Sequence, residues 1–279
     1  MNKIKISTTL LLAATLLPCA LPAQETAYER FRGHNAALKE VQPTWMSPLV
    51  QPDSRLGQSL RLSFSNSYTT TGTRTANLGN WHTLNLPVGS RAQVNLMAPP
   101  YIQNHSPALK DGFGDPMAEV KYRIASGNPD HGNYTLTALL AETWPTGSYK
   151  NGAATAVYYP TLAAGKMWGR FNVQSTLGGV MPTGKIAAQG RQIDWSTTAQ
   201  VLVGAHLWAD LEDNAMFNVG GPMGGTTENF VMPAAFVVVW RKEWGPAHAA
   251  TVLGGGMQIA TSAFHTYNHN LIAEVRVLF

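Results

Sequence analysis

Hydrophobic and polar residues alternate along many short stretches of this chain, and the alternation is clearest in the final eleven residues. One face of that stretch is apolar and consists of Leu271, Ala273, Val275, Val277 and Phe279. The other face carries the charged residues Glu274 and Arg276. A period of two predicts a β-strand that lies between two different environments. This pattern fits a strand between lipid and water in a membrane barrel, and also a half-buried strand in a soluble sandwich.

The same alternation recurs upstream, for example in residues 60–65, 91–96, 118–124 and 171–177. Turn signals rich in Gly, Pro and Asn separate these segments. Dividing the chain at the turns predicts about twelve strands, and single-chain bacterial barrels have an even number of strands. The predicted spans are 58–71, 80–88, 90–97, 114–125, 134–143, 155–166, 169–181, 194–204, 207–218, 229–242, 248–262 and 268–279.

Two features depart from simple alternation. Glu142 is in phase with the apolar residues Leu136 and Leu140, so we expect it at the water level or after a bulge. The segment at residues 229–242 is apolar on both faces and contains Pro233, which is unusual inside a strand.

The N-terminal residues predict export. Lys3 and Lys5 precede an apolar run from Ile6 to Leu17, and small residues follow before a polar stretch. This order is typical of a secretory signal peptide, and the run is too short for a membrane-spanning helix. We expect cleavage after Ala23, which removes residues 1–23. Cys19 raises a lipoprotein signal as an alternative, but the proline directly before it makes a poor match.

Composition narrows the class of protein. Removal of the signal peptide also removes the chain's only cysteine, which leaves no disulfide framework and no thiol chemistry. Charged residues make up 13% of the chain, against about 25% in soluble domains. The 18 basic residues left after cleavage nearly balance 16 acids, which argues against nucleic acid as a partner. An exported chain poor in charge, without a second long apolar run, predicts a protein of the Gram-negative outer membrane.

The region at residues 24–57 has a different character. It contains Pro43, Pro48 and Pro52, mixed charge and no strand period. We expect a periplasmic extension or a plug folded into the barrel, and a short disordered lead is an equal alternative. The barrel itself is expected at residues 58–279. Residues 99–111, which include Pro99 and Pro107, are expected to form an inward-folded or extracellular loop.

No residue pattern predicts catalysis or a bound cofactor. His265 and His269 stand four apart, but they flank the end of a strand and lack the following Glu of a zinc-binding helix motif. A barrel enzyme acting on lipid needs a Ser and a His held together by a third polar group. Only His82 with Ser63, Ser65 or Ser67 offers such a set, and nothing in the sequence brings these residues together. We therefore expect no enzyme, no metal and no cofactor.

Charged residues on the polar phase of the strands are the candidate functional set. On the inner wall of a barrel, charges of mixed sign select solutes or pair to stiffen the wall. Both roles remain open, and a twelve-stranded barrel is compatible with a narrow pore or a plugged tube. The candidates for lining the lumen and setting its selectivity are Arg61, Arg91, Glu119, Lys121, Arg123, Glu212, Glu274 and Arg276.

Tryptophans fall near the ends of the predicted strands. Indole rings collect at membrane interfaces, so a girdle is expected, with scattered core tryptophans as the alternative. The residues concerned are Trp81, Trp144, Trp168, Trp195, Trp208, Trp240 and Trp244.

Three short motifs resemble those of a known family. They are Gly112-Phe113-Gly114-Asp115-Pro116, Trp144-Pro145-Thr146-Gly147 and Tyr267-Asn268-His269-Asn270. With the strand through Lys121-Tyr122-Arg123 that follows the first motif, they resemble the bacterial outer-membrane proteins grouped as "MetA-pathway of phenol degradation" transporters, over about residues 45–279. The resemblance implies a monomeric barrel that passes aromatic or other hydrophobic compounds. It supplies no binding residues.

The sequence thus predicts an all-β, transmembrane, antiparallel up-and-down β-barrel that takes up small, aromatic or hydrophobic compounds passively. Its expected partners are outer-membrane lipid, a small-molecule solute and, through the C-terminal strand, the barrel-assembly machinery. The alternatives are a barrel enzyme acting on lipid and an exported structural or adhesive β-protein.

Overall fold

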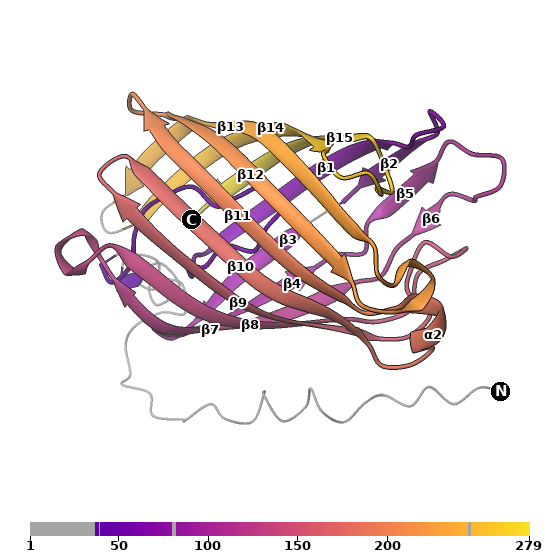
Figure 1. Cartoon of the computed structure of the whole chain (residues 1–279). Coiled ribbons are helices and arrows are strands. Elements are labelled where there is room, and N and C mark those ends of the chain that lie inside the picture. Colours follow the sequence, from indigo (N-terminus) through magenta and orange to yellow (C-terminus); the bar gives the residue numbers. More distant parts are fainter. Residues whose placement is uncertain (1–36, 39, 80–81, 245–246) are drawn as a thin grey trace.

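The computed structural model describes residues 37–38, 40–79, 82–244 and 247–279 (Figure 1). The predicted signal peptide, residues 24–36 and Trp81 lie outside the described residues. Nearly all regular structure is β. The strands are β1 (Ser59–Tyr68), β2 (Arg74–Leu78), β3 (Thr83–Val88), β4 (Ala92–Met97), β5 (Tyr101–Asn104), β6 (Gly112–Phe113), β7 (Met117–Gly127), β8 (Tyr134–Thr143), β9 (Val157–Trp168), β10 (Phe171–Pro182), β11 (Gln192–Val203), β12 (Leu207–Asn218), β13 (Thr227–Trp244), β14 (Ala247–Ala260) and β15 (His269–Leu278).

The strands close into a barrel. β1 pairs antiparallel with β15 over ten residue pairs, from Ser59 with Leu278 to Tyr68 with His269. Along the sheet, β2 and β3 both pair with β1, while β5 pairs with β2 and β4 with β3. Three strands of the barrel are therefore interrupted and consist of two segments each: β2 with β3, β4 with β5, and β6 with β7. The result is a closed barrel of twelve antiparallel strands, which confirms the predicted fold class.

The three interruptions are neighbours, and two glycines allow their close approach. A Cβ on Gly79, which has φ +133°, would come within 2.9 Å of Pro100 Cα, and a Cβ on Gly114 would come within 2.9 Å of Pro100 Cγ. The Gly114 N–H donates to the Pro100 carbonyl at 2.8 Å. The predicted loop at residues 99–111 is therefore wrong in part. β5 occupies residues 101–104, because the sheet resumes after the Pro99-Pro100 break, and only residues 105–111 form the loop.

The two faces of the barrel wall differ in polarity, and the apolar face is the outer one, as a membrane requires. On β10 the polar residues Asn172 and Gln174 face inward and are at most 1% exposed, whereas Leu177 on the outer face is 56% exposed. Soluble proteins have the opposite arrangement, with apolar residues buried and polar residues exposed. The outer apolar face matches a lipid-facing wall and the inner polar face a lumen. This inversion excludes the soluble sandwich that alternation alone left open.

The two ends of the barrel have different connections. One end, the short-turn end, has turns such as residues 89–91, 169–170 and 204–206. The other, the loop end, lies to the right in Figure 1 and carries longer connections, including residues 144–156 and the short helix α2 (Ile186–Gln189). Two 3₁₀ turns complete the regular structure: η2 (Pro129–His131) and η3 (Gly221–Met223). Within the described residues, no helix has the length and apolar character to cross a membrane.

The irregular strands have local explanations. Glu142 is the penultimate residue of β8 at the loop end, where the Tyr158 hydroxyl bonds it, so it lies at the edge of the apolar band. Pro233 pairs with Leu211 on β12, and on its other side the pairing with β14 skips the two positions between Val231 and Ala234. The proline therefore takes a place where no ladder N–H is needed.

Candidate functional site

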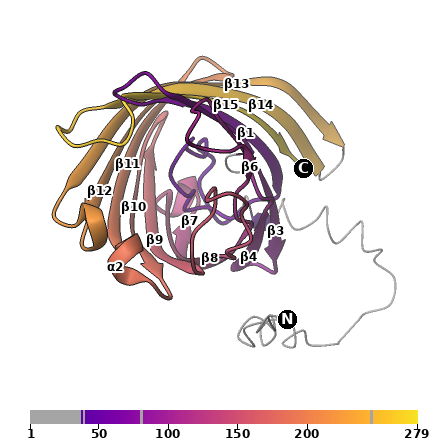
Figure 2. The ribbon, with the colours of Figure 1, turned by 90° about the vertical axis from the view of Figure 1, so that its right-hand side faces the viewer.

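The lumen contains a segment of the chain itself. Residues 42–57, here called the luminal segment, precede β1 and lie inside the ring of strands (Figure 2). The Gln42 side chain accepts the Leu56 N–H at 3.1 Å and donates to the Leu56 carbonyl at 2.5 Å. These two bonds close the segment into a loop. Most of the described part of the predicted N-terminal region, residues 42–57, therefore lies inside the barrel.

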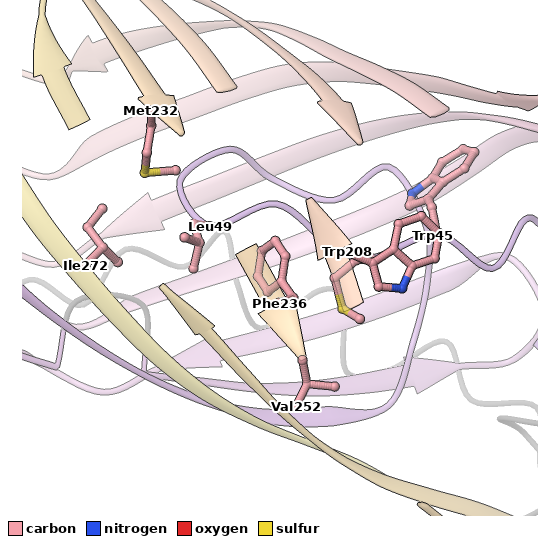
Figure 3. Close-up of a cluster of buried hydrophobic side chains, with 8 residues drawn as sticks. Trp45, Leu49, Trp208, Met232, Phe236, Val252 and Ile272 are labelled. Carbon is pink, nitrogen blue, oxygen red and sulfur yellow. The ribbon is translucent and has the colours of Figure 1, made fainter. Parts of the chain in front are cut away.

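Apolar packing joins the luminal segment to the wall at β12 to β15. Leu49 is fully buried, and Trp45 is 2% exposed. Figure 3 shows these side chains among residues from the inner wall. Together with Met46, they form one buried cluster with Trp208, Met232, Phe236, Val252 and Ile272. The inner face of β13, which the sequence already shows to be apolar, is thus the surface on which the segment packs.

Two glycines in the wall make room for aromatic rings. A Cβ on Gly165 would lie 2.7 Å from Cζ2 of Trp45, and a Cβ on Gly254 would lie 2.5 Å from the Phe236 ring. Real Cβ atoms do not approach other atoms so closely, so side chains at these positions would displace the rings. The lack of a side chain at Gly165 on β9 and at Gly254 on β14 is thus part of the fit between the luminal segment and the wall.

Glu212 on β12 anchors the backbone of the luminal segment. Its two carboxylate oxygens accept the N–H groups of Leu49, at 2.5 Å, and Val50, at 3.2 Å. Glu212 is fully buried, and a buried carboxylate needs hydrogen-bond partners. The chain reversal at residues 49–50 supplies them. Glu212, which the sequence predicts to line the lumen, thus joins the wall to the luminal segment.

Cations of the wall anchor the segment through its carbonyl oxygens. Lys121 on β7 donates to the carbonyls of Asp53, at 2.5 Å, and Arg55, at 2.6 Å. Arg276 on β15 donates to the Ser47 carbonyl at 3.2 Å. Arg61 on β1 donates to the Leu49 carbonyl. Three predicted lumen cations therefore hold three different stretches of the segment.

The other predicted acids are paired within the wall. Glu274 bonds both Arg61 and Arg276, and Glu119 accepts a hydrogen bond from Asn95 at 2.6 Å. Arg123 donates to the Gln42 side chain at 3.1 Å and to the Ser90 carbonyl. Of the two roles that the sequence left open, pairing is thus observed for these residues, and solute selection stays a prediction.

Arg91 is the exception among the eight candidates. It is exposed in the turn between β3 and β4, rather than on the inner wall. Gly89 takes a left-handed φ of +69°, so the chain reverses there and β4 begins only after Arg91. The predicted place of Arg91 in the lumen is therefore wrong, because the alternation of β4 does not continue into the turn before it.

Asp53 organises the polar side of the luminal segment. Its carboxylate pairs with the Arg55 guanidinium at 2.8 Å and accepts a hydrogen bond from the Ser47 hydroxyl. Burial raises the pKa of Asp53, but the charges of Arg55 and Lys121, together with these hydrogen bonds, outweigh burial. The pKa therefore lies below the ordinary value of 3.8. Asp53 is accordingly an anion at neutral pH.

A cavity of about 590 Å³ remains between the luminal segment and the wall, in the half of the barrel nearer the short-turn end. Its apolar side includes Met167, Leu202, Trp208 and Val252. Its polar side includes charged residues from β1, β7, β13, β15 and the segment. This volume lies within the range of about 300–1,000 Å³ that small-molecule sites occupy.

The connection between β14 and β15 folds inward at the loop end. Tyr267 stacks on the fully buried Phe230 with ring centroids 4.4 Å apart, and its hydroxyl bonds Gln258 at 3.1 Å. Glu228 accepts the N–H of Thr266 at 3.2 Å. The Tyr267-containing motif of the sequence is thus a connection packed into the lumen.

The other two motifs meet at the loop end. The Asp115 carboxylate accepts the N–H groups of Thr146, Gly147 and Ala153 at 2.9, 2.7 and 2.6 Å. A Cβ on Gly152 would come within 2.2 Å of Asp115 Oδ1, so the loop can close over the carboxylate only with glycine there. Asp115 therefore fixes the shape of the connection at residues 144–156 and joins the Gly-Asp-Pro motif to the Trp-Pro-Thr-Gly motif.

The tryptophans divide between membrane and lumen. Trp168 and Trp240 near the short-turn end, and Trp195 near the loop end, are 43–53% exposed on the outer wall, as a girdle requires. Trp208 is 6% exposed and belongs to the luminal cluster, so its place in the girdle is wrong. Trp208 differs from the other three because side chains alternate along a strand, and Trp208 shares the inward face of β12 with Asp210 and Glu212.

The histidines take local roles. His265 bonds the Ser262 carbonyl and Asn268, and the His269 ring stacks on Tyr68 at 4.7 Å. The His82 ring meets the edge of Phe64 at 5.2 Å. Among the described residues, no group of three His, Cys, Asp or Glu side chains is placed to hold a metal ion.

Sequence reasoning missed the residues that make the fit. Trp45, Leu49 and Phe236 carried no recognisable motif, and Gly165 and Gly254 looked like ordinary strand glycines. A usable signal was present on β13, where an apolar inner face breaks the alternation and indicates that something apolar fills the lumen.

Comparison with known proteins supports the fold. No family model and no curated protein sequence matches this chain. An outer-membrane channel from Pseudomonas putida F1 is similar in structure, with a TM-score of 0.55 and 14% identity, covering 84% of this chain and 100% of that one. The NanC porin gives a TM-score of 0.49 and 7% identity, covering 80% of this chain and 99% of the porin. This chain has the fold of an outer-membrane β-barrel.

Proposed function

We propose that this chain is an outer-membrane channel for passive uptake of small molecules with aromatic or other hydrophobic bodies, and that the luminal segment is its plug. The observation that carries the proposal is the segment inside the closed barrel, held by Glu212, Lys121 and Arg276. The hydrogen bonds that hold the backbone N–H and carbonyl groups of the segment can break without unfolding the wall, since the wall is hydrogen-bonded within itself.

The similar structure from Pseudomonas putida F1 is described as an outer-membrane channel, which supports the class of function. Aromatic or hydrophobic solutes are the finer part of the proposal. They follow from the resemblance to the phenol-degradation transporters and from the apolar side of the cavity, which includes Trp208 and Met167.

The orientation follows from the connections. Outer-membrane barrels have short periplasmic turns and longer extracellular loops. We therefore assign the loop end to the outside and the short-turn end to the periplasm. The outer face then contacts lipid, and β15 with the terminal Phe279 is the segment through which the barrel-assembly machinery would recognise the chain.

Single-channel conductance in a planar bilayer tests the proposal, with the mature protein compared with a form lacking residues 24–57. The plugged channel predicts rare or small openings for the mature protein and a severalfold larger current for the truncated form. Heat-modifiable gel mobility verifies that both forms are folded. Equal conductance of two folded forms would overturn the plug, and silence from both would overturn the channel.

A further inference from the structure

The cavity beside the luminal segment combines an apolar wall with an excess of cations. Its lining includes two acids, Asp53 and Glu119. Both already bond neighbouring side chains, Asp53 with Arg55 and Glu119 with Asn95. The lining cations are Arg55, Arg61, Lys121, Arg241 and Arg276. A site that is apolar on one side and cationic on the other fits a small anion with an apolar body.

Glu274 and Glu212, two wall acids that do not line the cavity, also have bonding partners. Glu274 bonds both Arg61 and Arg276, so two guanidinium groups share one carboxylate. Glu212 accepts two backbone N–H groups of the luminal segment. The cations at the cavity surface therefore keep donor capacity for a further anion, since a guanidinium carries five N–H donors and an ammonium three.

Arg241 reaches the cavity because of a β-bulge. The pairing of β13 with β14 shifts between Val238 and Trp240, so one extra residue is inserted there. Val238 pairs with Val252 before the shift and Arg241 pairs with Ala250 after it, and all four line the cavity. Without the bulge, a residue three positions after Val238 would face the lipid. Bulges that redirect a side chain are common at the rims of barrels and next to active sites.

The four lining cations that belong to the wall fall into two groups. Arg61, Lys121 and Arg276 donate to carbonyl oxygens of the luminal segment. Arg241 takes part in none of the hydrogen bonds found between described wall residues and this segment. It therefore offers a guanidinium to a ligand without releasing the plug, while the other three already donate to the segment, and Arg61 and Arg276 also bond Glu274.

We propose that this cavity binds small carboxylates with an aromatic or other apolar body, and that the ligand competes with the luminal segment for the wall cations. This inference rests on the proposed channel and names its substrate class. A carboxylate is a stronger acceptor for Lys and Arg than a backbone carbonyl. A carboxylate seated on Arg241 draws Lys121 and Arg276 away from the carbonyls of Asp53 and Ser47. The ligand thereby loosens the plug that covers its own path.

Binding to the mature barrel in lipid nanodiscs tests the site, with benzoate as the probe and benzyl alcohol as its neutral counterpart of similar shape. Titration calorimetry should show benzoate binding at least about tenfold more tightly than benzyl alcohol, because charge-assisted hydrogen bonds are the stronger ones. R241Q should weaken benzoate about tenfold and leave benzyl alcohol unchanged. The matched control is R170Q, which removes the same charge from an exposed turn residue at the same end of the barrel, outside the cavity lining, and should leave both affinities unchanged.

The competition has its own readout in bilayers. Benzoate should raise the open probability of the mature protein and leave the form lacking residues 24–57 unaffected, because that form has no plug to loosen. Equal affinity for the two probes, or no effect of R241Q in a protein with normal gel mobility, would overturn the carboxylate site. If truncation opens the channel but benzoate neither binds nor opens it, only this inference fails. If truncation opens nothing, the proposed function fails instead.

Discussion

The two sides of the lumen hold the luminal segment in different ways. At β12 to β14, side chains of the segment pack into an apolar surface formed by Trp208, Phe236 and Val252. At β7 and β8, by contrast, Lys121 and the hydroxyls of Thr135 and Thr137 bond the segment at residues 53–55. Apolar burial has no substitute in water, whereas a hydrogen bond to a carbonyl can be exchanged for another acceptor.

This difference predicts how the segment moves. The part packed at β12 to β14, residues 45–50, is the permanent anchor. The part at β7 and β8, residues 53–57, is the exchangeable part, and it borders the cavity. Changes on the apolar side should therefore release the segment more completely than changes on the polar side. Hydrogen exchange of peptides covering residues 42–57 measures this release directly.

Leu49→Ala should have the largest effect. Leu49 is fully buried at the centre of the apolar side, and such substitutions cost about 2–5 kcal/mol. We expect the exchange protection of residues 45–50 to fall by that amount while the barrel strands keep theirs. Val41→Ala is the matched control, because Val41 is 42% exposed just before the segment. Unchanged protection in L49A would show that the apolar side is not the anchor.

Glu212→Gln comes next. It keeps the size of the side chain but removes the charge that accepts the Leu49 and Val50 N–H groups. Hydrogen bonds to charged groups contribute about 1.5–3 kcal/mol, so protection at these two amides should fall by about that much. Asp213→Asn, one residue away and exposed, serves as the control. Equal effects of the two variants would show that Glu212 does not anchor the luminal segment.

Gly165→Ala tests the fit from the wall. The added methyl would lie 2.7 Å from the Trp45 ring, and overpacking costs about 1–3 kcal/mol. We expect a loss of protection around Trp45 and a red shift of its fluorescence. Gly255→Ala on β14 is the comparison, because its new Cβ meets only the Ile272 carbonyl, at 3.4 Å. A neutral G165A would mean that Trp45 does not lie against β9.

Asp53→Asn should have the smallest effect and a dependence on pH. Because the pKa of Asp53 lies below 3.8 in the folded protein, its stabilising contribution is present above pH 3.8 and is lost as pH falls below that value. At pH 7 the variant should lose about 1 kcal/mol of protection at residues 53–57, and at lower pH the two proteins should converge. A difference that persists unchanged in acid would exclude the carboxylate as its source.

Much of the barrel was predictable from the chain, and the content of its lumen was not. Alternation ending at Phe279 predicts β15, and twelve strands follow from the turn signals, because lipid imposes one rule on every outward residue. Luminal contacts obey no such rule. Glu212 and Lys121 were recognisable as inward-facing, but their partners on the luminal segment lie more than sixty residues away in sequence.

Local irregularities account for the remaining differences. Arg241 faces the cavity only because of a bulge, and Arg91 faces solvent because a glycine turn precedes it. The first depends on a one-residue change in phase and the second on where the strand begins, and alternation alone reveals neither.

A disulfide between segment and wall tests most directly that residues 42–57 occupy the lumen of the folded barrel. The Ser54 and Thr135 hydroxyl oxygens lie 2.6 Å apart, which suits a pair of cysteines, and the natural Cys19 falls in the predicted signal peptide. Ser54→Cys with Thr135→Cys should cross-link without catalyst in the outer membrane and reduce conductance until a reductant is added. Ser54→Cys with Ser196→Cys on β11 should not cross-link. Failure of the first pair to form in folded barrel, or equal yields from both pairs, would contradict the account.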